Sequence, residues 1–374
     1  MSTEPTHDVL PVNDRERSER VLRALAPVSR LLNRVALVML REDVGGQGRH
    51  VDPDAPGAPP PATARWTTAH AAAVASPTME HFRSALRPVG GGTEREGVLD
   101  DLARYFSISS EEALARCLDW ESASLQEWEA APRDSVDGIA GFYASATSWA
   151  FDLSWYNYLQ VSGTGYPKSV IVADRLRIAS GMRVLDYGSG VGATAQLFAA
   201  LGCEVTLADV AKPLLDFARW RLDERGTPAR YVHLAAALPV ASFDVVTALD
   251  VMAHVPPEEL RGTVEAIHAA LRSGGLFVTG FDVRRKSRRN AWHLYDDDLP
   301  LRWEIARAGF RRADLIDAGV WIYRAGSTRG VRGRAHIAWA WVRLASPPAR
   351  LLRRCRRVVA RAGLTVFFLV AARR

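Results

Sequence analysis

Apolar residues are spaced in two different ways along this chain, and the spacing changes near residue 182. Before that point they recur at steps of three and four, which predicts helices over residues 15–42, 66–87 and 98–128. Beyond it, short apolar runs alternate with longer amphipathic stretches. Such alternation is typical of an α/β fold, in which helices cover both faces of a parallel sheet.

Individual elements of this α/β part follow from the same pattern. Strands are expected at 184–187, 205–208, 231–234, 245–249, 276–279 and 320–323. Helices are expected at 193–200, 213–223, 257–271 and 299–308. A last apolar run, 364–371, is too short to span a membrane and is interpreted as a final strand that returns to the sheet.

Breaker residues and composition divide the chain into three parts. Residues 1–65 combine the first helix with a linker rich in glycine and proline. Residues 66–168 form a helical layer whose segment 141–165 is unusually aromatic, and that segment either packs on the next domain or also lines a ligand site. Residues 169–374 form the α/β domain, with an arginine-rich helical insertion at 326–362 before the last strand.

A glycine-rich loop follows the first strand of the α/β domain, with the sequence Asp186-Tyr187-Gly188-Ser189-Gly190-Val191-Gly192. Glycines let the chain turn sharply and let a ligand touch the backbone, and the helix beyond offers unpaired N–H groups. Dinucleotide sites use Gly-x-Gly-x-x-Gly to hold a pyrophosphate. This loop has a different spacing, and Asp186 would repel an anion, so an NAD(P)-dependent oxidoreductase is disfavoured. A ligand with a cationic amine fits better.

Residues Val184 to Gly192 resemble the first motif of the class I S-adenosylmethionine-dependent methyltransferases. Later landmarks fit the resemblance: Asp209 after strand 2, Asp250 to Val255 after strand 4, Leu271 to Leu276 with Ser273 where proline is usual, and Ala308-Gly309-Phe310. The resemblance implies a Rossmann-like seven-stranded sheet of order 3-2-1-4-5-7-6 with strand 7 antiparallel. It also implies S-adenosylmethionine as the cofactor.

The resemblance implies a set of cofactor-binding residues: Asp186, Gly188, Ser189, Gly190, Gly192, Asp209, Val210, Ala236 and Asp250. Asp209 would take the ribose hydroxyls and Val210 would lie against the adenine. The alternatives are that Asp186 caps its own turn and that Asp209 is a solvated helix N-cap. Many family members carry an acid for the adenine amino group where this chain has Ala235-Ala236-Ala237, and losing that hydrogen bond costs about 1 kcal/mol.

Candidate catalytic residues lie on the acceptor side. His254 follows strand 4, where it either acts on the acceptor as a base or supports the loop, and Tyr143 is a candidate hydroxyl. Further candidates are Tyr156, His293 and Tyr295. No cluster has metal-ligand spacing, so no metal is expected. The expected function is methyl transfer to a small, partly apolar organic acceptor. The alternative is a non-catalytic protein that binds S-adenosylmethionine.

Charge is distributed unevenly. The chain carries a net charge of +6, but residues 329–374 hold 12 arginines and no acidic residue, so the remainder carries −6. A nucleic-acid-binding surface over the whole protein is therefore not expected. The arginines around 350–361 flank an apolar helical face that either contacts an anionic membrane or packs on this chain or a second copy. A basic run at 284–289 is either a solvated loop or a contact for an acidic substrate group.

Length and composition indicate a globular protein of 374 residues, 48% hydrophobic and 24% charged. The three cysteines, Cys117, Cys203 and Cys355, are too far apart to indicate a disulfide framework or a zinc cluster, which favours a reducing cytoplasm. The first 20 residues contain no apolar core of a secretory signal. A cytoplasmic protein with optional peripheral membrane contact is expected, and the oligomeric state is not specified.

Overall fold

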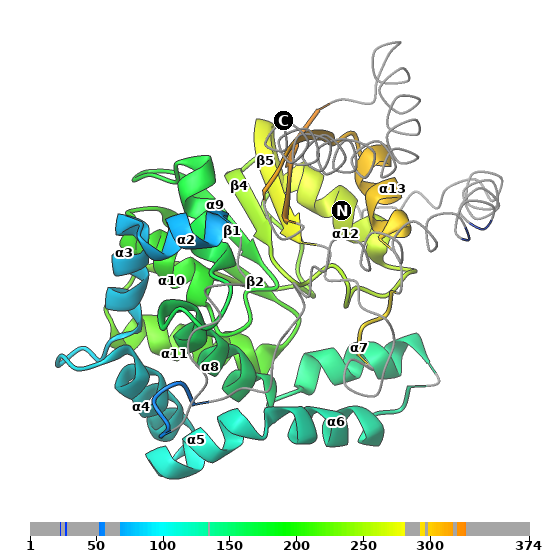
Figure 1. Cartoon of the computed structure of the whole chain (residues 1–374). Helices are drawn as coiled ribbons and strands as arrows, with labels where there is room; N and C mark the ends of the chain where they lie inside the picture. The colour runs from blue at the N-terminus through cyan, green and yellow to red at the C-terminus, as the bar shows by residue number, and fades with distance from the viewer. Residues whose placement is uncertain are drawn as a thin grey trace, which may run out of the picture.

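The structure is a computed structural model of the chain, shown in Figure 1. It describes residues 23, 27, 52–56, 68–133, 135–280, 292–295, 298–316 and 320–326. Most of the predicted helix over 15–42, the basic run 284–289 and the arginine-rich segment with the run 364–371 lie outside the described residues.

Seven strands form one sheet of order β3-β2-β1-β4-β5-β7-β6, which confirms the predicted order. The strands are β1 (Arg183–Tyr187), β2 (Glu204–Asp209), β3 (Ala229–His233), β4 (Phe243–Ala248), β5 (Leu271–Gly280), β6 (Arg311–Leu315) and β7 (Val320–Arg324). Strands β1 to β5 run parallel to one another, and β7 is antiparallel to both β5 and β6. The carboxyl ends of β1, β2 and β4 therefore meet at one edge of the sheet.

The last two strands come from a different part of the chain than predicted. The sixth strand, β6, reads Arg-Arg-Ala-Asp-Leu, so it has no apolar run to reveal it. An edge strand pairs on one side only and tolerates such charged residues. The run at 320–323, expected as the sixth strand, is the seventh strand of the described sheet, and the run 364–371 lies outside the described residues.

Helices of the N-terminal layer are α2 (Thr68–Val74), α3 (Pro77–Leu86), α4 (Glu94–Phe106), α5 (Ser110–Leu118), α6 (Trp120–Ala130), α7 (Val136–Ser145), α8 (Trp149–Val161) and α9 (Lys168–Leu176). Helices of the α/β domain are α10 (Ala193–Ala200), α11 (Lys212–Glu224), α12 (Leu260–Ala270) and α13 (Leu299–Arg307). Side-chain caps begin several of them: Ser109 accepts from the N–H of Glu112, and Thr93 forms a complete capping box with Glu96.

Alternate residues of the central strands point into two separate cores. Val184 of β1 belongs to a core shared with α3, α4, α5 and α8 to α11, whereas Leu185 belongs to a core shared with α12 and α13. Figure 1 shows the sheet between α9 and α10 on its left and α12 and α13 on its right. Both faces are covered, as the alternating pattern predicted.

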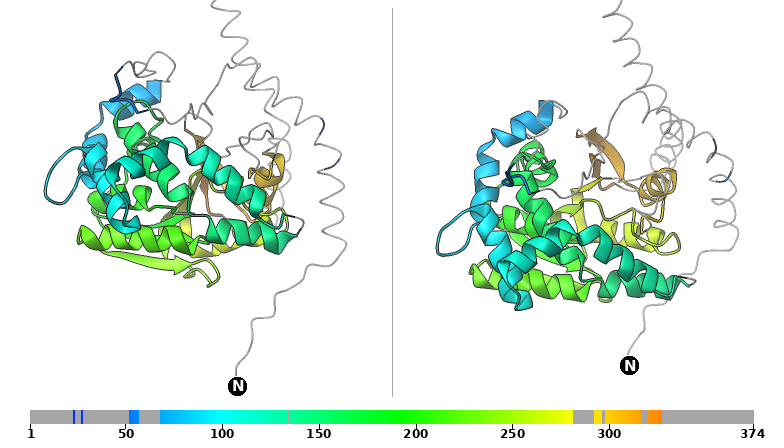
Figure 2. Two further views of the ribbon diagram at one scale, coloured as in Figure 1. Left: turned by 90° about the horizontal axis from the view of Figure 1, so that it is seen from below. Right: turned by 60° about the horizontal axis from the view of Figure 1, so that its bottom comes forward.

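The N-terminal layer wraps around the α/β domain. Helices α5, α6 and α7 lie below the sheet in Figure 1 and come forward in the views of Figure 2, while α3 and α4 run along its left side. Most aromatic side chains of the segment 141–165 are buried, Trp155 completely, so this segment does pack on the next domain. Residues of α7 and α8 also reach the carboxyl edge of the sheet, where the predicted site lies.

Candidate functional site

The glycine-rich loop turns over the end of β1 and leads into α10. Its three glycines, Gly188, Gly190 and Gly192, all have positive φ angles, of 68°, 51° and 77°. A Cβ on Gly188 would lie 2.4 Å from Cγ2 of Val251, and one on Gly190 would lie 2.7 Å from Cδ1 of Leu153. Side chains therefore press on the loop from both sides, and the positions exclude larger residues.

Asp186 is the last but one residue of β1 and is fully enclosed. Its Oδ1 accepts a hydrogen bond from Thr247 Oγ1 at 2.9 Å. Burial raises the pKa of Asp186 to about 7, although the hydroxyl of Thr247 and the backbone N–H of Ala195 act in the opposite direction. A cationic group beside this carboxyl would stabilise its charged form. The site thus has the chemistry to hold an amine.

Asp209 ties the end of β2 to the glycine loop. Its Oδ2 accepts from the N–H of Gly190 at 2.7 Å and its Oδ1 from the N–H of Ala211 at 2.8 Å. Burial raises its pKa, so the alternative of a solvated N-cap is wrong. The backbone N–H of Val210 also donates to this carboxylate, and an ionised carboxylate has about four lone-pair positions, so one remains for another donor such as a hydroxyl.

The region beside Asp209 is open to solvent. Val210 keeps 42% of its surface exposed, an unusual state for a valine, and Ala236 is also exposed. The loop Ser189 contributes a hydroxyl that is buried and has no hydrogen-bond partner among the described residues. A buried polar atom in this state gains a partner when a polar ligand binds.

His233 was not predicted as a site residue. It ends β3 in register with Asp209, and its Nε2 lies 3.1 Å from the carbonyl of Val210. The charge of His233 also lowers the pKa of Asp209, against the larger effect of burial. The sequence signal was its position, since the last residues of adjacent parallel strands meet at one edge.

Asp250 follows β4 with a strained backbone, at a φ of 60°. Both of its carboxylate oxygens lie 2.5 Å from Nζ of Lys168, at the start of α9. Asp250 was predicted to contact the cofactor, and here its carboxylate pairs with a lysine 82 positions away. Sequence spacing gave no signal for Lys168 because the partners meet only in the folded chain.

An aromatic cluster surrounds His254, formed by Tyr143, Trp149 and His293. The centroid of the His254 ring lies 5.6 Å from that of Tyr143, 5.9 Å from that of Trp149 and 4.7 Å from that of His293. Three separate segments contribute: α7, the start of α8 and the chain after β5. The structure thus brings together the predicted residues Tyr143, His254 and His293 at the carboxyl edge of the sheet.

Hydrogen bonds fix the polarity of this aromatic cluster. The carbonyl of Trp292 accepts a short hydrogen bond from Tyr143 Oη and lies 3.3 Å from Nδ1 of His254. Since a carbonyl can only accept, this contact places a proton on Nδ1 of His254. Burial raises the pKa of Tyr143, so its hydroxyl stays protonated and is not a base.

Two further candidates have structural partners. Tyr295 Oη donates to the carbonyl of Val255 at 2.9 Å, which supports the loop after β4. Tyr156 Oη donates to the carbonyl of Tyr166 at 3.3 Å. These bonds give both hydroxyls a role in holding the chain.

Within the described residues, no group of three or more His, Cys, Asp or Glu side chains is arranged to hold a metal ion. Cys117 and Cys203 are buried free thiols. None of the described helices combines the length and the apolar character needed to cross a membrane.

Comparisons with known proteins find a methyltransferase domain in the sheet-forming part of the chain. Residues 184–275 match the family model of a methyltransferase domain. The ubiquinone biosynthesis O-methyltransferase of Ruegeria pomeroyi is 35% identical over 129 residues, which cover 33% of this chain and 50% of that protein. The enzyme of the same name from Aromatoleum aromaticum is 37% identical over 106 residues, or 27% of this chain and 44% of that protein. The chain spans about half the length of these curated relatives.

A solved structure resembles part of the chain, the 1,6-didemethyltoxoflavin-N1-methyltransferase of Burkholderia thailandensis with bound 1,6-didemethyltoxoflavin and S-adenosylhomocysteine. It is 26% identical, with 43% of this chain and 77% of that chain covered and a TM-score of 0.35. The order of the seven strands and the matched segment 184–275 support a domain of the class I S-adenosylmethionine-dependent methyltransferase family in this chain. The cofactor of that family is S-adenosylmethionine.

Proposed function

We propose that this chain transfers a methyl group from S-adenosylmethionine to a small, partly apolar organic acceptor. One observation carries the proposal: the turn after β4 joins the glycine-rich loop to the aromatic cluster. Val251 packs on Gly188 at one end of this turn. At the other end of the turn, the N–H of His254 donates to the carbonyl of Val251 at 2.9 Å. A cofactor on the loop and an acceptor beside His254 would therefore be neighbours.

The residues at the loop fit the cofactor. Asp186 offers a buried carboxyl to the amine, and the unpartnered hydroxyl of Ser189 offers a second polar contact. Asp209 has an acceptor position for a ribose hydroxyl. Val210 and the backbone at Ala236 are exposed where the adenine would lie.

When bound, S-adenosylmethionine supplies a methyl group on a positively charged sulfur, which is already activated for displacement. The chain then has to orient the acceptor and keep water away, and orientation alone supplies a large part of the rate. Rings from Tyr143 and Trp149 provide an apolar, planar boundary. Nε2 of His254 accepts the proton of an acceptor hydroxyl, because Nδ1 is held by the Trp292 carbonyl.

Two features support a planar acceptor with a hydroxyl group. The aromatic cluster offers flat apolar surfaces beside His254. The relatives from Ruegeria pomeroyi and Aromatoleum aromaticum are named as O-methyltransferases, although they match over about half their length. The arginine-rich segment 326–362 would suit an acceptor held at a lipid surface.

Calorimetric titration with S-adenosylmethionine and S-adenosylhomocysteine tests the first step, and we expect both to bind. The second step is transfer of labelled methyl groups to a panel of hydroxylated aromatic compounds, with amines and thiols of the same size as controls. Failure of both cofactor forms to bind would contradict the proposal at its base. Transfer to amines alone would keep the methyltransferase and remove the hydroxyl acceptor.

A protein that binds S-adenosylmethionine without turnover is the second candidate. The specific observation in its favour is the exposed stretch Ala235-Ala236-Ala237, which offers no acidic side chain to the adenine. Tight binding of both cofactor forms, with no transfer to any acceptor class, would favour this second function.

A further inference from the structure

A buried ion cluster connects the N-terminal helical layer to the glycine-rich loop. Asp101 of α4 accepts from Nε of Arg221 at 2.9 Å, and Arg221 of α11 donates through Nη1 to the carbonyl of Val191 at 2.9 Å. Arg225, one turn further along α11, donates to both oxygens of the same carboxylate, at 2.8 and 3.0 Å. The side chains of Arg221 and Asp101 are 0% and 5% exposed, so solvent does not screen these contacts.

The carbonyl that Arg221 holds belongs to the centre of the loop. Val191 stands between Gly190 and Gly192 and is itself 2% exposed. Without Arg221 this buried acceptor would lose the hydrogen bond that the guanidinium provides, a state that a folded chain avoids by shifting its backbone. The orientation of the Val191 peptide is therefore coupled to the position of the guanidinium.

The surrounding packing makes α11 a firm support for this contact. A Cβ on Gly192 would lie 3.0 Å from Cβ of Ala218 and 3.5 Å from Cδ1 of Leu222, so α11 touches the loop on both sides of Arg221. Arg225 also donates to the carbonyl of Ala85 at the end of α3, as does Gln196 of α10. Three layers of the fold thus meet at the cluster.

We propose that Asp101 and Arg221 are positioning residues: Asp101 orients Arg221, and Arg221 holds the glycine-rich loop in the conformation that binds the cofactor. The helical layer then does more than cover the sheet, because α4 contributes the carboxylate that sets the loop. Neither residue touches the reacting atoms. The inference rests on the proposed function only for the identity of the ligand.

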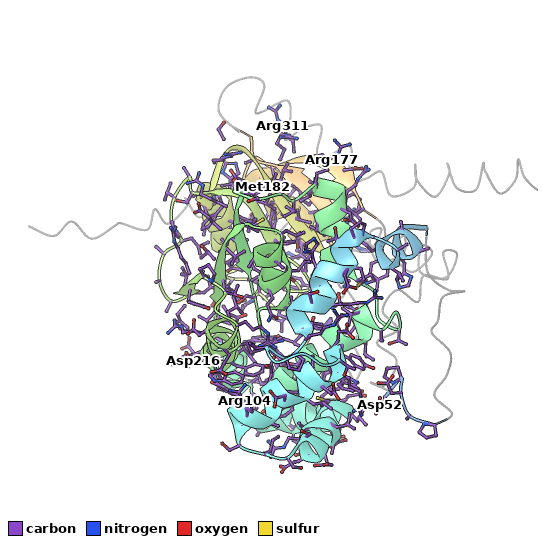
Figure 3. The ribbon with its side chains drawn as sticks, turned by 90° about the vertical axis from the view of Figure 1, so that its left-hand side faces the viewer. Asp52, Arg104, Arg177, Met182, Asp216 and Arg311 are labelled. Carbon is purple, nitrogen blue, oxygen red and sulfur yellow. The ribbon has the colours of Figure 1, made fainter. Side chains whose placement is uncertain are left out.

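A matched control pair exists between the same two helices. Arg104 of α4 pairs with Glu224 of α11 at the surface, where their side chains are 52% and 35% exposed. Figure 3 labels Arg104 on α4 near Asp216 on α11, on the side of the molecule where the two helices lie together. The Arg104 pair joins α4 to α11 as the buried cluster does, and the partners of Arg104, which are Glu224, Asp100 and Trp220, lie outside the loop.

The test compares Asp101→Asn, Arg221→Gln, Arg221→Lys and the control Arg104→Gln in the full-length chain. We expect S-adenosylhomocysteine to bind about tenfold more weakly to Asp101→Asn and Arg221→Gln than to the parent. Arg104→Gln should bind it as tightly as the parent does. Arg221→Lys keeps the charge but cannot reach Asp101 and Val191 together. It should fold well and still bind about tenfold more weakly.

Hydrogen exchange of the loop amides, measured without ligand, separates positioning from general stability. Exchange over residues 188–192 should quicken in the Asp101 and Arg221 variants and stay unchanged in Arg104→Gln, even where melting temperatures are similar. The double variant Asp101→Asn/Arg221→Gln should lose about as much affinity as either single change, because both break one chain of contacts.

Three results would overturn the positioning role. The first is a dissociation constant and a loop exchange rate in Arg221→Lys that equal those of the parent. The second is a double variant whose loss of affinity is the product of the two single losses. The third is an equal loss of affinity in Arg104→Gln. If the parent itself binds no S-adenosylhomocysteine, the proposed function fails instead. The exchange measurement still decides whether Asp101 and Arg221 hold the loop.

Discussion

At the scale of single residues, Asp186 shows what sequence can and cannot give. Its place before the glycines indicated a partner for a cationic amine, and the structure puts it at the expected edge of the sheet. The sequence could not show that Thr247, 61 positions away, donates to it, or that burial raises its pKa to about 7. Those properties depend on what the fold packs around the carboxyl.

The raised pKa of Asp186 gives a pH dependence with a definite sign. In the unfolded chain its pKa is about 3.9. Without ligand, the folded state therefore binds the proton more tightly, and this contribution to stability is lost as the pH rises from about 4 through about 7. Asp186→Asn should remove that slope, so its melting temperature should fall less than that of the parent between pH 5 and pH 8.

Cofactor binding by Asp186 should have the opposite slope. The ammonium pairs with the charged carboxylate, so affinity of the parent for S-adenosylhomocysteine should rise between pH 5 and pH 8. Asp186→Asn should bind about tenfold to a hundredfold more weakly at pH 8, with little pH dependence. Calorimetry at three pH values measures both. Equal slopes in parent and variant would show that another group titrates.

His254 and Tyr143 are predicted to differ in their effect on turnover. His254→Ala removes the base and should lower kcat by about a hundredfold or more with an acceptor that the parent uses. Tyr143→Phe removes a hydroxyl whose pKa is raised by burial, and should lower kcat by less than about tenfold. Neither change should alter the dissociation constant of S-adenosylhomocysteine. A large loss for Tyr143→Phe alone would reverse the two roles.

At the scale of elements, the helices of the α/β domain were predicted well, the expected helices 66–87 and 98–128 are each divided into shorter ones, and one strand was missed. The helix 193–200 agrees with α10 because an apolar face and a glycine turn mark it in the sequence. Strand β6, with the sequence Arg-Arg-Ala-Asp-Leu, follows no alternating pattern that would separate it from a loop. This segment becomes a strand because it pairs with β7, and a single sequence does not show which segments pair.

The strands of the described sheet predict that residues after Thr328 are dispensable for it. All seven strands lie within 183–324, and the carbonyl of Gly326, which faces Nε2 of His268 at 2.8 Å, is retained in a chain ending at Thr328. We expect that shortened chain to keep the circular dichroism, the melting transition and the cofactor affinity of the parent. Loss of cooperative unfolding would restore the run 364–371 as a necessary element.

At the scale of the whole molecule, the helical layer and the α/β domain both contribute side chains to the candidate site. Tyr143 and Trp149 from the layer meet His254 from the domain, and Asp101 of the layer reaches the glycine-rich loop through Arg221. The sequence predicted the cofactor part because one short segment carries its motif. It left the acceptor open because that side is assembled from three distant segments, none of which has a motif.

The uneven charge of the chain makes a last prediction, on membrane contact. If the arginines around 350–361 lie on an anionic bilayer, each contributes about 1 kcal/mol near the surface. Changing Arg353, Arg354 and Arg357 to Glu should then abolish sedimentation with vesicles that contain phosphatidylserine. The parent should bind them at low salt and release them at high salt, because salt screens surface charge.

A control of equal net charge separates this segment from the overall charge of the protein. Arg177, Arg230 and Arg311 are exposed on the described surface, and their change to Glu lowers the net charge by the same amount. This control should still sediment with the vesicles. Equal loss in both variants would assign binding to net charge. A parent that never sediments would favour packing of the segment on the acidic remainder of the chain or on a second copy. Cofactor binding by the chain that ends at Thr328 would then show whether that packing supports the site.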